Sequence, residues 1–70
     1  MKVYVVTKAQ PMMGEHYVTV KAAKKEAEKV IRAEYPNARK EESLWAGYDS
    51  YACKNRDGSW TFMYIREETI

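Results

Sequence analysis

The strongest constraint on the fold of this chain is a predicted β-hairpin over residues 48–66, closed by a turn at residues 55–58. Side chains alternate between the two faces of a strand, and here both faces are apolar. The returning arm carries Trp60, Phe62 and Tyr64 on one face and Met63 and Ile65 on the other. A chain of 70 residues has little material to cover two apolar faces, so the hairpin predicts association with a further apolar surface.

The length predicts a single domain over residues 1–70, near the lower size limit for folding alone. Domains of this size usually need disulfides, a metal ion or a partner subunit. Cys53 is the only cysteine and His16 the only histidine, which excludes an intrachain disulfide and a metal site of the usual Cys/His type. We expect a buried Cys53 thiol, no cofactor, and a homo-oligomer, most simply a dimer.

Charge and hydropathy indicate a soluble, cytoplasmic protein that does not associate with membranes. Twelve basic and ten acidic residues leave a net charge of +2, which is too small to indicate nucleic-acid binding by itself. The start of the chain becomes polar after Val6, unlike a signal peptide. No run of residues approaches the roughly eighteen apolar positions that span a bilayer.

The first half of the chain predicts two strands followed by one helix. Lys2–Thr7 is a strand buried on both faces, Lys8–Glu15 is a connection, and His16–Val20 is a strand that pairs antiparallel with the first. Ala22–Tyr35 has a helical period, and Pro36 marks its end. The apolar stripe of this helix consists of Ala23, Ala27, Val30 and Ile31.

The second half predicts a charged connection, Asn37–Ser43, followed by residues 44–47, which lead into the hairpin and could cover a sheet edge. We predict a three-residue hairpin loop, Arg56–Gly58, which places Ala52 opposite Phe62. A turn of two residues would shift this register by one and exchange the faces of the first arm. The chain therefore predicts an α+β fold of order ββαββ, with one amphipathic helix packed on a small antiparallel sheet that ends in a C-terminal hairpin.

Aromatic side chains in and just before the hairpin form the candidate interface. The set consists of Trp60, Phe62, Tyr64, Tyr48 and Trp45. Burial beneath the helix or in a subunit interface is the favoured interpretation, because aromatic residues contribute mainly through burial. The sequence leaves open which sheet face the helix covers. Exposed aromatics beside Lys54 and Arg66 could instead stack unpaired bases, as open sheets that bind RNA do.

A second candidate is a basic face of the predicted helix that could contact nucleic acid or another anion. It consists of Lys21, Lys25, Lys29 and Arg32, with Lys24 alongside. Cations at this spacing could follow a phosphate backbone. However, Glu28 lies within the set and can pair with Arg32, and a charged face opposite an apolar stripe is typical of any surface helix. A solvated face is the favoured interpretation.

The sequence predicts neither enzyme activity nor catalytic residues. The conceivable acid and base groups are Glu15, His16, Asp49, Glu67 and Glu68. Nothing in the chain pairs a nucleophile with a base, supplies a glycine-rich phosphate loop or gathers metal ligands. His16 is interpreted as a strand residue at the end of a loop.

Residues 23–29 and 54–60 resemble parts of the arm-binding domain of phage-type tyrosine integrases, in which a sheet reads DNA and a helix follows it. Here the helix precedes the hairpin, so we interpret this likeness as shared local structure. Residues 2–6 and 25–36 resemble small uncharacterised proteins of bacterial phages and prophages, which open with a similar strand and carry a similar helix ending at Tyr-Pro. That resemblance implies a phage-type accessory protein of a Gram-positive host and transfers no functional residue.

The favoured function is a non-enzymatic protein-interaction module that forms homo-oligomers through the sheet face left uncovered by the helix. The alternative is a small nucleic-acid-binding module that uses the basic helix face. The expected partner is a second copy of the chain or another protein, ahead of nucleic acid, and not a membrane.

Overall fold

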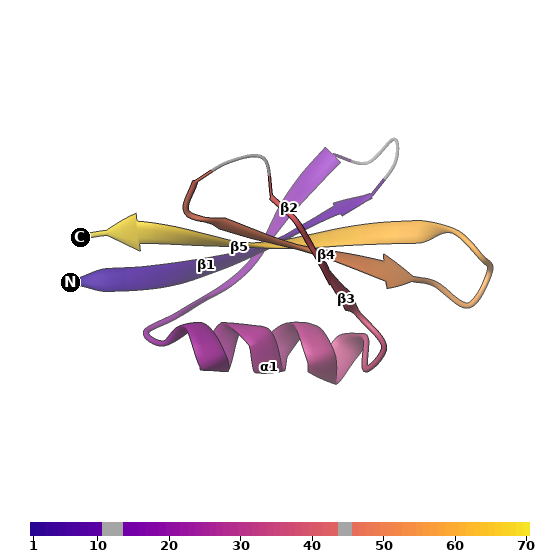
Figure 1. Ribbon diagram of the computed structural model, residues 1–70, viewed down its shortest axis with the longest axis horizontal. Coiled ribbons are helices and arrows are strands. Elements are labelled where there is room, and N and C mark those ends of the chain that lie inside the picture. The colour runs from indigo at the N-terminus through magenta and orange to yellow at the C-terminus, as the bar shows by residue number, and fades with distance from the viewer. Residues whose placement is uncertain (11–13, 44–45) are drawn as a thin grey trace.

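A computed structural model describes residues 1–10, 14–43 and 46–70, which form one helix and a five-stranded antiparallel sheet. The elements are β1 (Lys2–Gln10), β2 (Gly14–Lys21), α1 (Lys24–Glu34), β3 (Arg39–Glu41), β4 (Tyr48–Lys54) and β5 (Trp60–Thr69). The strand order is β2-β1-β5-β4-β3, and α1 lies across one face of the sheet (Figure 1). The predicted α+β class, with the helix packed on an antiparallel sheet, is confirmed.

The first two strands are longer than predicted. They pair antiparallel as expected, but β1 continues through Gln10 and β2 begins at Gly14, so much of the predicted connection at residues 8–15 is strand. Residues 11–13 of that connection lie outside the described residues. Polar residues can extend both strands because the hydrogen bonds between strands join backbone N–H and C=O groups and do not depend on the type of side chain. The register shifts once, where Val18 is an extra residue in β2.

The helix is slightly shorter than the predicted range of residues 22–35. Ala23 is its exposed N-cap and makes no side-chain capping hydrogen bond. Ala27 and Ile31 are fully buried, and Val30 packs partly buried against them, which confirms these members of the apolar stripe. Glu34 is the last helical residue and Tyr35 is the C-cap, because the following proline disfavours a helical conformation at Tyr35.

The short strand β3 corrects the prediction of a charged connection at residues 37–43. Arg39–Glu41 pairs with Ser50–Ala52 of β4, so the order is ββαβββ and not ββαββ. All its side chains are charged and exposed, and no alternation of apolar and polar residues marks it as a strand. A short charged strand of this kind protects the sheet edge from pairing with other chains.

The hairpin has the predicted register and loop. Ala52 lies opposite Phe62 in the ladder of β4 and β5. In the turn, the Gly58 N–H donates to the Asn55 carbonyl at 3.1 Å, and the Asn55 N–H donates to the Ser59 carbonyl at 2.8 Å. Gly58 has a φ of 88°, a left-handed conformation that glycine adopts without strain.

Gly58→Ala is expected to lower the free energy of unfolding by about 1 kcal/mol, because a Cβ is strained at this φ. No heavy atom lies within 4 Å of the added Cβ, so the loss comes from the backbone alone. Gly58→Asn should lose less, since asparagine tolerates the left-handed region better. Urea unfolding followed by circular dichroism measures both variants, and equal losses would contradict this account of the turn.

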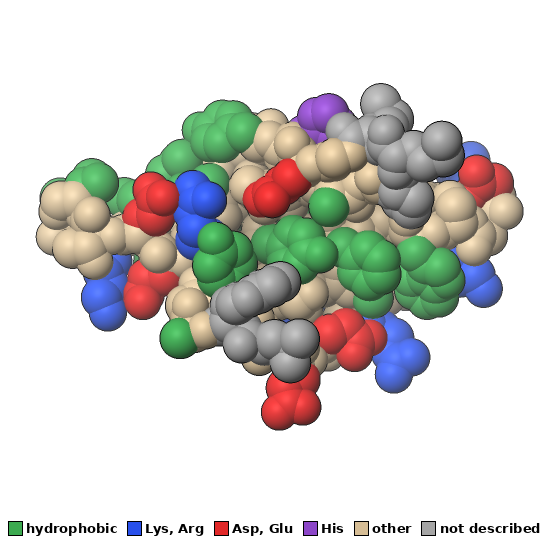
Figure 2. Space-filling view, turned by 90° about the horizontal axis from the view of Figure 1, so that it is seen from above, with side chains coloured by type: hydrophobic (Ala, Val, Ile, Leu, Met, Phe, Trp, Pro, Cys, Tyr) green, Lys and Arg blue, Asp and Glu red, His purple; other side chains and the backbone are tan. Residues whose placement is uncertain are grey.

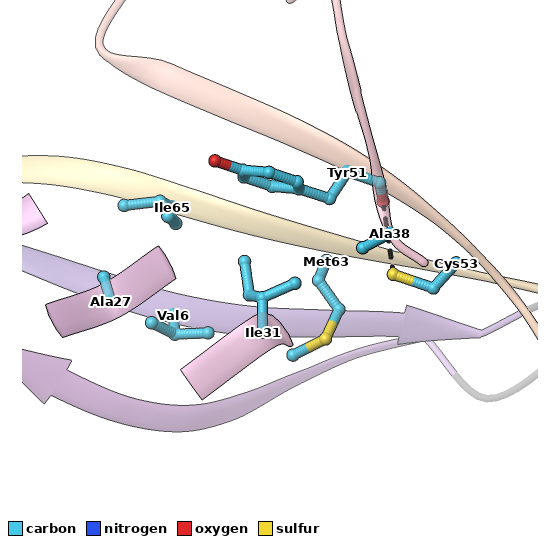
Figure 3. Packing of buried hydrophobic residues seen from close by; sticks show 8 residues of the cluster. All are labelled: Val6, Ala27, Ile31, Ala38, Tyr51, Cys53, Met63 and Ile65. Atoms are coloured by element: carbon cyan, nitrogen blue, oxygen red, sulfur yellow. Dashed lines mark hydrogen bonds between the residues drawn. The ribbon is translucent and has the colours of Figure 1, made fainter. Parts of the chain in front are cut away.

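The hydrophobic core lies between α1 and one face of the sheet (Figure 3). It consists of Val6, Ala27, Ile31, Ala38, Tyr51, Cys53, Met63 and Ile65. Cys53 is fully buried, as predicted, and burial raises the pKa of its thiol. The helix therefore covers the face of Met63 and Ile65. The sequence favoured burial of Trp60, Phe62 and Tyr64 either beneath the helix or in a subunit interface. The first of these two alternatives is wrong.

Candidate functional site

The sheet face opposite α1 carries the candidate interface, and no other helix or strand of the described residues covers it. We call it the open face and define it by the side chains that share a side with Trp60, Phe62 and Tyr64 of β5. Trp60 is 42% exposed and Phe62 is 38% exposed, whereas Tyr64 and Tyr48 are half-buried. Figure 2 looks onto this face and shows a row of hydrophobic side chains along it. Trp45 lies outside the described residues.

Strand β2 extends the apolar surface to the sheet edge. Tyr17 and Val20 pair with Thr7 and Val5 of β1, which places them on the open face, and both are exposed. Val18, the extra residue between them, is exposed as well. The sequence predicted this strand and its pairing with the first strand, but it gave no reason to include the strand in the interface, because it did not place β1 beside β5.

Small residues form a buried floor between the aromatic side chains. Thr7 and Ala52 are almost fully buried, although they face away from the helix. Thr7 pairs with Tyr64 across β1 and β5, and Ala52 pairs with Phe62 across β4 and β5. Close cross-strand packing of this kind restricts the aromatic rings, which favours binding because little conformational entropy remains to be lost.

Charged groups lie at the two ends of the open face. At the hairpin end, Lys54 Nζ is 5.9 Å from the centre of the Trp60 ring. At the other end, near the chain termini, Arg66 Nη2 is 2.8 Å from a carboxylate oxygen of Glu68. The two ends therefore differ in charge, with a cation at the hairpin end and an ion pair near the termini. Figure 1 shows that the hairpin turn and the two termini lie at opposite ends of the molecule.

The predicted basic face of the helix is less continuous than expected. Lys21 belongs to β2, because α1 begins at Lys24, so its assignment to the helix is wrong. Lys24 Nζ lies 2.8 Å from the Asp49 carboxylate, and this hydrogen bond raises the pKa of Lys24. Lys25 is exposed on the helix surface.

The remaining members of the basic face, Lys29 and Arg32, have partners within the chain. Lys29 Nζ lies 3.4 Å from Glu26. Arg32 Nη1 donates to the Ala38 carbonyl at 2.8 Å, and its guanidinium lies 5.8 Å from the centre of the Tyr51 ring. Arg32 therefore connects the end of α1 to the segment before β3. These contacts occupy part of its guanidinium, which leaves fewer N–H groups to bind a ligand.

The candidate acid and base groups are dispersed over the molecule. Glu15 and His16 are neighbours in β2 and therefore project from opposite faces of the sheet. Asp49, Glu67 and Glu68 each form an ion pair with a lysine or arginine. In the part of the chain that the structure describes, no three His, Cys, Asp or Glu side chains are placed to hold a metal ion. The lack of enzyme activity stays a prediction.

The structure also contains a hollow that the sequence did not indicate. It has a volume of about 760 Å³ and is bordered by Arg39, Arg56 and Trp60. The two arginines are far apart in the sequence, one in a stretch predicted as a connection and one in a turn. Only the folded chain brings them together. The sequence offered one signal for this site, a tryptophan close to a turn that contains an arginine.

Comparison of the chain with known protein families, with curated proteins and with solved structures found no match. The resemblance to phage and prophage proteins therefore stays a prediction. No helix among the described residues is long and apolar enough to span a membrane.

Proposed function

We propose that this chain is a non-enzymatic protein-interaction module that pairs with a second copy of itself through the open face. The proposal depends mainly on the exposure of Trp60 and Phe62 on a sheet face that no helix of the described residues covers. Large exposed apolar patches on soluble proteins commonly mark interaction sites. A phage-type accessory role, inferred from the resemblance of residues 2–6 and 25–36, is part of the same proposal.

The energy available from this surface is sufficient for a stable pair. Burying about 400 Å² of apolar surface on each subunit would contribute roughly 10 kcal/mol per subunit before the cost of association. That cost is commonly about 4–15 kcal/mol for the pair. The aromatic side chains are already restricted by packing against Thr7 and Ala52. This lowers the entropic cost of association, because fewer side chains have to be ordered on binding.

Charge favours a two-fold arrangement in which the β5 strands of the two subunits run antiparallel. Lys54 and Glu68 lie on the open face near opposite ends of β5, since Lys54 pairs with Trp60 at its start and Glu68 is near its end, on the same side as Trp60. In the antiparallel arrangement, Lys54 of each subunit lies over Glu68 of the partner subunit. A parallel arrangement would place like charges opposite each other, which is unfavourable.

Light scattering on a sizing column over a range of concentrations tests the proposal. The unmodified chain should give a dimer whose population rises with concentration. Phe62→Ala should weaken the dimer about tenfold or more, because each subunit loses apolar contact worth about 1 kcal/mol. The variant should stay folded, since Phe62 is outside the core beneath the helix.

Val30→Ala is the matched control, because it shortens a partly buried apolar side chain on the helix side of the sheet. It should leave the association unchanged. A monomer at every concentration would refute self-association through the open face. Equal weakening by the two variants would also refute it, because the effect would then arise from lost stability and not from the interface.

A further inference from the structure

The hollow of about 760 Å³ lies where one edge of the sheet is incomplete. β3 pairs only with residues 50–52 of β4, so on that side Cys53 and Lys54 have no neighbouring strand within the described residues. The hollow opens at this gap, between the segment that leads from α1 to β3 and the hairpin turn. Its place follows from the short length of β3.

One hydrogen bond joins the two walls of the hollow, and a second fixes the side chain that accepts it. The Tyr35 hydroxyl, at the end of α1, donates to Asn55 Oδ1 in the hairpin turn at 3.0 Å. Asn55 Nδ2 in turn donates to Ser59 Oγ at 2.9 Å. Ala38 and Ala52 lie between these walls and are buried, and their small side chains leave the space open. The hollow is therefore preformed and of the size of small-molecule sites.

Three cations line the hollow, namely Arg39 of β3, Lys54 of β4 and Arg56 of the turn. In the described part of the chain, no carboxylate oxygen lies within 4.0 Å of any of the three. Glu34, the acidic residue of the lining, forms an ion pair with Lys8. Unpaired cations around a concave surface attract an anion.

The carbonyl end of α1 borders the same hollow and by itself disfavours an anion. Arg32 offsets this effect, because its guanidinium donates to the Ala38 carbonyl at 2.8 Å and adds positive charge at the helix end. The Asp57 carboxylate in the neighbouring turn accepts hydrogen bonds from the backbone N–H and the hydroxyl of Ser59. These hydrogen bonds lower the pKa of Asp57, so its carboxylate stays negative. The four cations, three in the lining together with Arg32, still outnumber the two carboxylates of Glu34 and Asp57, so the net charge is positive.

The exposed indole of Trp60 adds an aromatic surface beside these cations, with Lys54 Nζ 5.9 Å from its ring centre. Arginine binds phosphate oxygens in a bidentate geometry, and aromatic side chains stack on unpaired bases. From this juxtaposition we infer that the hollow binds a nucleotide, with the phosphate on Arg39 and Arg56 and the base on Trp60. Trp60, Lys54 and Arg39 lie at the hairpin end of the open face and therefore belong to both proposals. Phe62 does not line the hollow, so Phe62→Ala tests the self-association and substitution of the two arginines tests the nucleotide site.

Two-dimensional ¹H–¹⁵N NMR of the full chain tests the inference with four probes: adenosine monophosphate, a short single-stranded DNA, adenosine and inorganic phosphate. We expect the nucleotide or the DNA to shift the amide signals of Arg39 and Arg56 and the indole signal of Trp60. Adenosine and phosphate alone should bind more weakly, because each supplies half of the contacts. Tighter binding of the DNA per nucleotide would assign the site to a single strand, and equal binding would assign it to free nucleotides.

The deciding variant is the double substitution Arg39→Gln and Arg56→Gln, which should weaken binding about tenfold or more for each lost charged contact. Its matched control is Lys21→Gln with Lys25→Gln, which also removes two positive charges, but from the predicted basic face and not from the hollow. The control should bind like the unmodified chain. Absence of shifts around the hollow at millimolar nucleotide, or an equal loss in the control, would overturn the inference.

Discussion

Replacing Ile31 with alanine is expected to lower the free energy of unfolding by about 3 kcal/mol, as is usual for a buried isoleucine. The Ile31 side chain is fully buried and extends from α1 toward the sheet, beside Val6 and Met63 (Figure 3). Its truncation leaves a cavity at the main contact between helix and sheet. For a domain of 70 residues, with a typical stability of about 4–10 kcal/mol, this is a large share of the total.

Urea unfolding followed by circular dichroism measures the loss, and Val30→Ala on the same helix is the control. Val30 is only partly buried, so its truncation should cost about 1 kcal/mol. Similar losses for the two variants would contradict the observed orientation of the helix. A loss at Phe62→Ala as large as that at Ile31→Ala would place the main core on the other face of the sheet.

Stability is also expected to fall as the pH rises from about 10 to 12, because of Tyr51. This side chain is 1% exposed, and its hydroxyl donates to Glu28 at 3.3 Å. Burial, followed by the negative charges of Glu28 and Asp49, raises the pKa of Tyr51 to about 12. In this pH range the unfolded chain loses the phenol proton while the folded chain keeps it. The stabilisation present below pH 10 is therefore lost toward pH 12, by on the order of 2 kcal/mol.

Tyr51→Phe isolates this effect from that of lysines that titrate nearby. Hydrogen bonds to Glu34 and Asp49 raise the pKa values of Lys8 and Lys24, so their contributions also decline at high pH. The phenylalanine variant keeps those lysines, and its stability should fall less steeply between pH 10 and 12. Denaturant unfolding at several pH values measures both slopes. Parallel curves would show that Tyr51 ionises alike in the folded and unfolded chains.

The elements that depend on near neighbours could be predicted from the sequence. The hairpin register follows from the turn residues, because Asn55 and Gly58 each suit one position of a three-residue loop, and the structure has that loop. The helix follows from the spacing of Ala27 and Ile31 and from Pro36, which ends it. In each case the residues that specify the structure lie within a few positions of each other.

Elements that depend on distant partners could not be predicted in this way. β3 is charged and exposed, and it is a strand only because β4 offers it a free edge. Lys21 was expected on the helix, but the ladder with β1 draws it into β2, where it pairs with Tyr4. The hollow beside Trp60 likewise needs β3 to be short and the α1–β3 segment to meet the hairpin turn.

The sequence by itself determined which side chains share a face of β4 and β5, because the alternation of the backbone depends on local geometry alone. In β2 the extra residue Val18 breaks the alternation, so Tyr17 and Val20 share a face. In β5 the sequence placed Trp60 with Phe62 and Met63 with Ile65, on opposite faces. Only the tertiary structure decided which pair α1 covers and which stays open. The periodicity of a sequence shows which residues share a face of a strand, but it does not show which element packs against that face. That choice depends on the combined packing of α1 with residues from β1, β4 and β5, which are far apart in the chain.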